Sequence, residues 1–140
     1  MGNRAVIQMQ DEDTGIYLHW NGGRDSIEPL LEVAREYGLR GDNYGIARLI
    51  QIIGNTFDGT LGMGAASPEH LDRDNGDNGT YVIDENFKIV NRLFQRYPEQ
   101  DNHSFDGMKE HIKKANDRFF KTPAADIDRV TKIIDVESIQ

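Results

Sequence analysis

The chain of 140 residues contains no cysteine, which excludes disulfide bonds, thiolate metal sites and a cysteine nucleophile. No segment approaches the roughly 18 consecutive apolar residues of a membrane span, and residues 1–10 lack the apolar core of a signal peptide. Basic residues are also few, since 16 Lys and Arg stand against 24 Asp and Glu, for a net charge of -8. A chain of this charge repels a polyanion. We therefore expect a cytoplasmic protein that binds neither a membrane nor long nucleic acid.

The composition indicates one small domain. The length suits a single compact domain over residues 1–140 and is too short for two. Hydrophobic residues make up only 37% of the chain and charged residues 29%. An apolar core of this size can be completed by a second copy of the chain. We therefore expect a homo-oligomer.

Four strands are expected, in two hairpins. Residues Ala5–Gln10 and Gly15–Trp20 have strand patterns and flank a polar turn. Residues Thr80–Ile83 and Phe87–Leu93 flank Asp84-Glu85-Asn86 in the same way. Residues 55–78 between the hairpins contain many Gly, Asp and Asn residues and are expected to be irregular.

Three or four helices complete the expected fold. The first spans Ser26–Tyr37, with Asp25 and Glu28 spaced as in a capping box. Asp42 is expected to cap a second helix through Ile53, and Ser104 a third through about Lys121. A short last helix is expected after Thr122-Pro123. Two hairpins packed with three to four helices make an α+β domain.

The most informative motif is a glycine turn between a strand and a helix. Glycines allow positive φ and close approach, the first N–H groups of the helix lack intrahelical partners, and an arginine adds positive charge. These features predict a phosphate-binding turn made by Asn21, Gly22, Gly23, Arg24 and Asp25. The alternative is a tight turn in which Asp25 only caps the helix.

The second hairpin offers the other parts of a nucleotide pocket. Tyr81 could stack on a base, while Asn91 and Arg92 could bind its polar edge and a phosphate. The alternative is that Tyr81 and Asn91 are ordinary strand residues. Arg48, in a very apolar helix, is either a surface residue with a buried stem or a cation that faces the ligand.

Other candidate chemistry is weaker. Residues 74–85 partly match an EF-hand calcium loop, but Gly76 replaces the third ligand, and we favour successive Asx turns. The four histidines lack paired metal spacing, so no metal site and no cofactor are assigned. Ser26 and His19 could form a nucleophile and base, although strand and cap roles explain both. The sequence therefore predicts no enzymatic activity.

The glycine turn resembles the pyrophosphatase loop of the N-type ATP pyrophosphatases. That loop reads Ser-Gly-Gly-x-Asp-Ser, and Asn21-Gly22-Gly23-Arg24-Asp25-Ser26 matches it at five of six positions. The leading serine is missing, and no alternating series of strands and helices follows the turn. This resemblance implies an alternative function, a nucleotide-using enzyme.

A longer resemblance is to the first Thoeris anti-defence family of small phage proteins. It rests on residues 2–7, 15–26, 44–49 and 74–79 and covers most of the chain to about Arg92. The resemblance implies a protein that sequesters, without cleaving it, the cyclic ADP-ribose isomer of Thoeris immunity in the cytoplasm of the infected cell. It also implies dimers or hexamers and separate pockets for cyclic di- or trinucleotides of related systems.

The same resemblance assigns roles to particular residues. Arg24 falls on the arginine of the cyclic-trinucleotide site. Tyr81 and Asn91 fall on an aromatic residue and an asparagine of the cyclic ADP-ribose site, and a shift of one residue would replace them by Val82 and Arg92. An acidic regulatory module that binds another protein is the further alternative to a nucleotide-binding protein.

Overall fold

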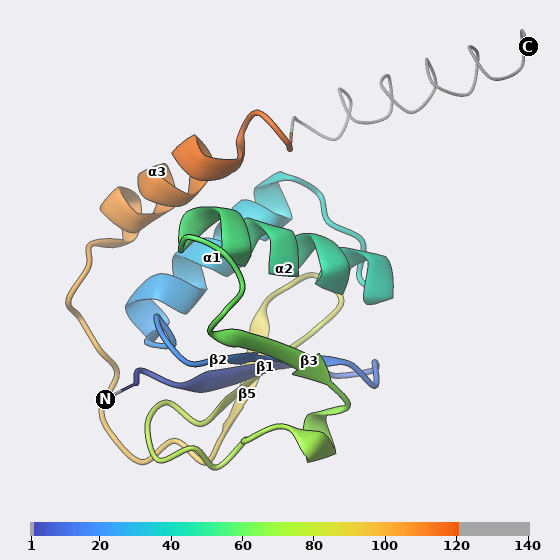
Figure 1. Ribbon diagram of the computed structural model, residues 1–140, viewed down its shortest axis with the longest axis vertical. Coiled ribbons are helices and arrows are strands. Elements are labelled where there is room, and N and C mark those ends of the chain that lie inside the picture. The colour runs from blue at the N-terminus through green and yellow to red at the C-terminus, as the bar shows by residue number, and fades with distance from the viewer. Residues whose placement is uncertain (1, 121–140) are drawn as a thin grey trace, which may run out of the picture.

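A computed structural model describes residues 2–120 (Figure 1). The last expected helix, from Thr122 with Ile127, Val130, Ile133 and Ile134, lies outside the described residues. In chain order the elements are β1 (Ala5–Met9), β2 (Gly15–Leu18), α1 (Arg24–Glu36), α2 (Asn43–Thr56), β3 (Met63–Ala66), the 3-10 turn η1 (Pro68–His70), β4 (Thr80–Ile83), β5 (Ile89–Leu93) and α3 (Phe105–Asn116). These elements confirm the α+β class.

The strands form one mixed sheet in the order β3-β2-β1-β4-β5. The two expected hairpins are present, and β1 joins them by pairing in parallel with β4, with Ile7 opposite Tyr81. The sheet also contains β3, which pairs with β2 inside the stretch that was expected to be irregular. The expectation of a sheet made from two hairpins alone was therefore incomplete by one strand.

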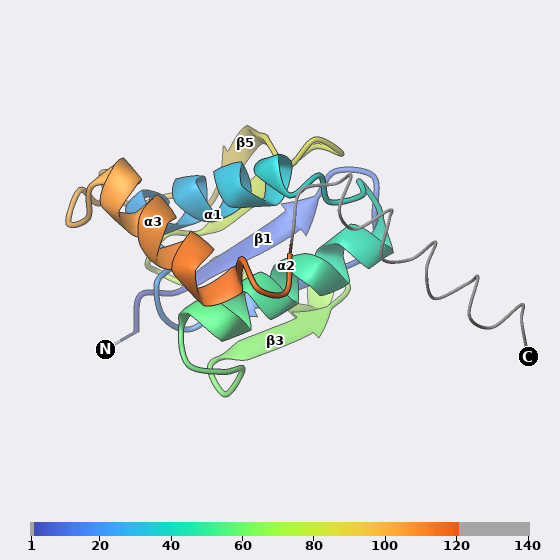
Figure 2. The same ribbon diagram turned by 90° about the horizontal axis from the view of Figure 1, so that it is seen from above.

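One face of the sheet carries the helices. Alternating residues of the central strands, among them Ile7, Ile16 and Ile83, are fully buried in the main core. Figure 2 shows α1 above the β1 side of the sheet, α2 above the β3 side and α3 crossing over both helices. Asn116 of α3 is buried and donates to the side chain of Thr56 on α2. This packing brings the start of α3 to the end of the sheet where β2 enters α1.

The opposite face of the sheet is covered by the connection between β3 and β4 (Figure 1). Arg4 before β1 donates from its side chain to Asp77 over 2.8 Å, and Arg73 donates to Gln8 of β1. Asn75 is 4% exposed and holds the loop through its side-chain amide. The residues between β3 and β4 therefore form a second layer that is irregular apart from the 3-10 turn η1.

Two of the three expected N-terminal helix caps are present. Asp42 accepts from the backbone of α2, and Ser104 accepts from Gly107 in α3. Helix α1 instead begins at Arg24 with Gly23 as its N-cap and no side-chain cap, so Asp25 does not cap it. Helix α3 ends at Asn116, earlier than about Lys121. None of the described helices is both long enough and apolar enough to cross a bilayer.

Candidate functional site

The glycine turn is held tightly against the start of β1. The positive φ of the turn falls on Asn21, at 61°, and neither Gly22 nor Gly23 adopts positive φ. A Cβ on Gly22 would lie 2.6 Å from the carbonyl oxygen of Asn3 and 2.7 Å from the Cβ of Ala5. The expected close approach is therefore present, whereas the expected positive φ at the glycines is not. An asparagine tolerates the left-handed conformation better than most residues.

The segment that leads into α3 lies across this turn. The carboxylate of Asp25 accepts from the backbone N–H of Asn102 over 2.8 Å and of His103 over 3.1 Å. The side-chain amide of Gln100 exchanges hydrogen bonds with that of Asn3 and contacts Gly23. Asp25 therefore connects the turn to the start of α3.

Arg24 points toward its own helix. Its guanidinium donates to one carboxylate oxygen of Glu28, with N–O distances of 2.8 and 3.0 Å. The Arg24 side chain is 43% exposed, so an anion from solution could reach it. Such an anion would compete with Glu28 for the guanidinium.

Tyr81 links the second hairpin to the glycine turn. Its ring is fully buried, and its hydroxyl donates to the carbonyl oxygen of Gly22 over 2.7 Å. Burial raises the pKa of this hydroxyl well above its ordinary value, so it keeps its proton and remains a donor. The Arg92 guanidinium lies 3.8 Å from the ring centroid. The stacking role of Tyr81 stays a prediction, and a base could use this face of the ring only if Arg92 moved.

The remaining predicted residues do not gather at one site: the Arg92 side chain is largely buried, whereas Asn91 and Arg48 are exposed. Arg92 also donates to the carbonyl oxygen of Asn78 over 2.8 Å and pairs with Glu99. The exposed Asn91 accepts only from the backbone N–H of Arg92. Arg48 is exposed on α2 and forms no hydrogen bond or ion pair within residues 2–120. The structure does not bring Arg48 to the glycine turn.

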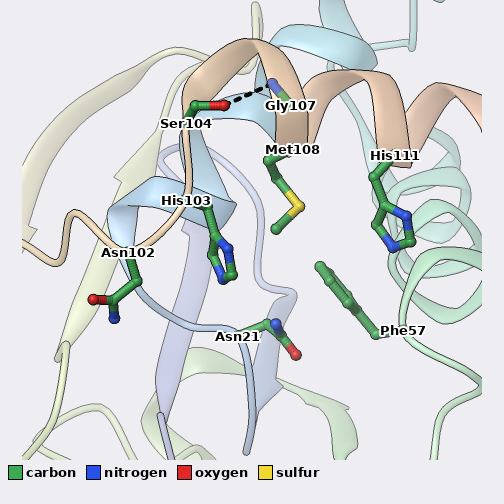
Figure 3. A pocket seen from close by; sticks show the side chains of 8 residues that line it. All are labelled: Asn21, Phe57, Asn102, His103, Ser104, Gly107, Met108 and His111. Carbon is green, nitrogen blue, oxygen red and sulfur yellow. Dashed lines mark hydrogen bonds between the residues drawn. The ribbon is translucent and has the colours of Figure 1, made fainter.

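Beside the turn, a pocket of about 540 Å³ opens between β2, α2 and α3 (Figure 3). It is lined by Asn21, Phe57, Asn102, His103, Ser104, Gly107, Met108 and His111. Figure 3 shows Asn21 and Phe57 on one wall, with the imidazoles of His103 and His111 directed toward them from the side of α3. Asn21 is the one predicted site residue that lines this pocket.

The polar side chains of this pocket are exposed or half-buried. Apart from Ser104, whose hydroxyl caps α3, none of them forms a side-chain hydrogen bond within the part of the chain described. They are the amides of Asn21 and Asn102 and the imidazoles of His103 and His111. Together they offer donors and acceptors around a space of the size that small ligands occupy.

Sequence reasoning considered His103 and His111 only as metal ligands and missed them as pocket residues. They come from a part of the chain about 80 residues after the glycine turn, and the contact of Asp25 with residues 102 and 103 brings them there. A signal was available in the pair Asn102-His103, two polar residues directly before the cap Ser104. Phe57 was missed because it follows α2 at its C-cap.

The other candidate groups have structural partners. His19 shares a hydrogen bond of 2.9 Å with the Tyr17 hydroxyl, and Ser26 is buried. The expected Asx turns are present, since Asn75 and Asp84 accept from backbone N–H groups that follow them. Asp74 pairs with Arg96. No group of three or more potential metal ligands occurs within the described residues.

Comparison of the chain with family models, curated proteins and solved structures finds no match. The fold and the pocket together describe an α+β protein with a candidate site at the junction of β2, α2 and α3.

Proposed function

We propose that this protein binds and sequesters a small cyclic nucleotide signal of the cyclic ADP-ribose type, without cleaving it, in the cytoplasm of an infected cell. The observation that carries the proposal is the pocket of about 540 Å³, whose amides and imidazoles have no side-chain hydrogen bond among the described residues. Amides and imidazoles that face solvent can exchange water for the hydroxyl and phosphate oxygens of such a ligand. The resemblance to the Thoeris anti-defence family supports the same ligand class.

Sequestration rather than turnover is supported by the roles of the nearby hydroxyl groups. Ser26 is buried, and the Ser104 hydroxyl accepts from the backbone of its own helix. Within residues 2–120 no serine forms a hydrogen bond with a histidine. A histidine beside a serine is a common way to activate a nucleophile, and the described residues do not form that pair.

The test is recovery of the ligand. The protein is incubated with cyclic ADP-ribose isomers, separated from free ligand and denatured, and the released compound is analysed by mass spectrometry. We expect one intact ligand per site. A linear, hydrolysed or transferred product would instead support the pyrophosphatase-like enzyme. A failure of every isomer to bind, together with a stable complex with another protein, would support the acidic regulatory module.

The pocket is tested by a paired variant. The double substitution His103→Ala and His111→Ala removes two exposed side chains and should leave the thermal midpoint unchanged within about 2 °C. We expect it to weaken binding of the retained isomer by about tenfold, because two partners of the phosphate groups are lost. The matched control is Lys114→Ala, an exposed change on the same helix. An equal loss of affinity in the double histidine variant and in Lys114→Ala would refute the assignment of the pocket as the binding site.

Assembly is part of the proposal, because the resembled family forms dimers and hexamers. Several aromatic side chains are exposed, including Tyr44 at 67% and Tyr97 at 64%. Exposed aromatic residues are common at interfaces between proteins. Sedimentation velocity with and without ligand should give a mass of two or six chains, and a monomer under both conditions would contradict this part of the proposal.

A further inference from the structure

A second, smaller cavity lies beside the pocket and shares two lining residues with it. It measures about 210 Å³, and both cavities are lined by Asn21 and Phe57. Its other walls include Leu18, Trp20, Ile53 and Met63. The site therefore has two chambers on either side of Phe57. The first has amides and imidazoles among its lining side chains, together with Phe57 and Met108, and the lining side chains of the second are apolar apart from Asn21.

Trp20 is exposed at the mouth of the second chamber. It is the only tryptophan of the chain, and 53% of its surface remains accessible. The backbone N–H of His19 donates to the carbonyl oxygen of Gly62 over 2.8 Å, which extends the pairing of β2 with β3 to this point. A Cβ on Gly62 would lie 3.1 Å from Cδ1 of the indole. Trp20 is therefore fixed beside the chamber by its backbone, while its ring remains open to solvent.

Two aromatic residues beside an apolar cavity suit a flat ring. An exposed indole gains free energy when an aromatic partner removes it from water, and base–aromatic stacking is tolerant of the base identity. The first chamber offers Phe57 and two imidazoles, and the indole of Trp20 in the second is the largest flat surface among the lining residues. One ligand that spans Phe57 would place oxygen-rich groups in the first chamber and a planar ring in the second.

We infer that the second chamber is the nucleobase subsite and the first chamber the sugar-phosphate subsite of one ligand. This inference rests on the proposed function and assigns parts of the ligand to the two chambers. Trp20 and Met63 then set the preference for a ligand with a planar base. Asn21, which lies in both chambers, contacts the ligand at the junction of the base and the sugar.

Trp20 itself provides the readout, because its fluorescence reports only this chamber. Three probes are titrated into the full chain by calorimetry and by fluorescence: cyclic ADP-ribose, adenosine and ribose 5-phosphate. We expect the two probes that carry a base to quench Trp20 emission and to protect it from acrylamide. Ribose 5-phosphate should bind without changing the emission.

Variants separate the chambers. Trp20→Ala should weaken cyclic ADP-ribose and adenosine by about tenfold and leave ribose 5-phosphate unchanged. The double substitution His103→Ala and His111→Ala should weaken ribose 5-phosphate and cyclic ADP-ribose but not adenosine. Lys114→Ala, an exposed change that lines neither chamber, is the control and should change none of the three.

The outcomes distinguish the two proposals. Calorimetric binding of cyclic ADP-ribose with unchanged Trp20 emission, and with wild-type affinity in Trp20→Ala, would overturn the nucleobase subsite and leave the proposed function standing. If none of the three probes binds, both the nucleobase subsite and the proposed function are overturned.

Discussion

The dipeptide Asn-Gly occurs both in the layer below the sheet and at the end of β2. The asparagine side chains are buried and hydrogen-bonded in the first place and accessible in the second. In the layer below the sheet, Asn75 and Asn78 are buried and their amides bind backbone carbonyl or side-chain groups. At the end of β2, the amide of Asn21 has no partner within residues 2–120 and lines both chambers of the pocket. The same two-residue sequence therefore builds a loop in one place and presents a free amide in the other.

The difference teaches how to separate structural from functional polar residues in this molecule. A buried amide must be satisfied, since leaving its partners unpaired costs free energy, and Asn75 satisfies four backbone groups at once. The amide of Asn21 is satisfied by solvent or by a ligand. We therefore expect substitutions below the sheet to change stability and substitutions at the pocket to change binding.

The largest effect is expected from Asn75→Ala. This substitution removes both the donors and the acceptor that hold the loop between β3 and β4, and it leaves buried N–H and carbonyl groups unpaired. The free energy of unfolding should fall by about 3 kcal/mol. Urea denaturation monitored by circular dichroism measures this free energy. Asn21→Gly is the control, because glycine keeps the positive φ. An equally large fall in the free energy of unfolding in this variant would remove the distinction between the layer below the sheet and the pocket.

A smaller loss of stability is expected from Gly22→Ala. The added methyl group would meet the backbone of Asn3 and the Cβ of Ala5. The cost should be about 2 kcal/mol, because these atoms belong to a packed strand. Gly64→Ala in β3 is the matched control, since its Cβ would lie 3.8 Å from that of Tyr17, an ordinary contact. Thermal unfolding of the two variants should separate them by several degrees, and equal midpoints would contradict the close approach at Gly22.

At the glycine turn, substitution of Arg24 should change binding and leave stability almost unaltered. Arg24→Ala should weaken cyclic trinucleotide binding by about tenfold, or ~1.4 kcal/mol, because a charge-assisted contact is lost. Glu28→Gln should have the opposite sign, since it removes the carboxylate that now holds the guanidinium. Isothermal titration calorimetry measures both. Unchanged affinity in both variants would remove Arg24 from the binding site.

The smallest expected effect is a pH dependence of the stability that the contact between Arg4 and Asp77 contributes below the sheet. Hydrogen bonds from Arg4 lower the pKa of Asp77 below its ordinary value of 3.8. The pKa of Asp77 is lower in the folded state than in the unfolded state. The contact with Arg4 therefore contributes its full stabilisation above pH 3.8, and this stabilisation is lost as the pH falls through the pKa of the folded state. The urea midpoints of wild type and Asp77→Asn should differ near pH 7 and converge toward pH 3. A constant difference across this range would contradict the assignment.

Local patterns in the sequence predicted most of the elements. The strands of both hairpins and the caps Asp42 and Ser104 follow from short-range chemistry. Strand β3 was missed because Met63-Gly64-Ala65-Ala66 contains no β-branched or aromatic residue, and its place at the edge of the sheet depends on pairing with β2. The parallel pairing of β1 with β4 joins distant residues and has no local signal.

The site was predictable in part. The Asn21–Asp25 motif identified the turn, and Asn21 lies in the pocket. The role of Asp25 was wrong, because its carboxylate binds the backbone of Asn102 and His103 instead of the first turn of α1. His103, His111 and Phe57 could not be joined to the turn from the sequence, since only tertiary packing of α3 brings them there.

Calorimetric titration of cyclic ADP-ribose isomers into the wild type and Asn21→Gly tests the central claim most directly. The amide removed is the one that lines both chambers, and glycine retains the backbone conformation of the turn. We expect the wild type to bind one isomer and the variant to bind it about tenfold more weakly at an unchanged thermal midpoint. Equal affinity in the two proteins, or no binding by the wild type, would contradict the account.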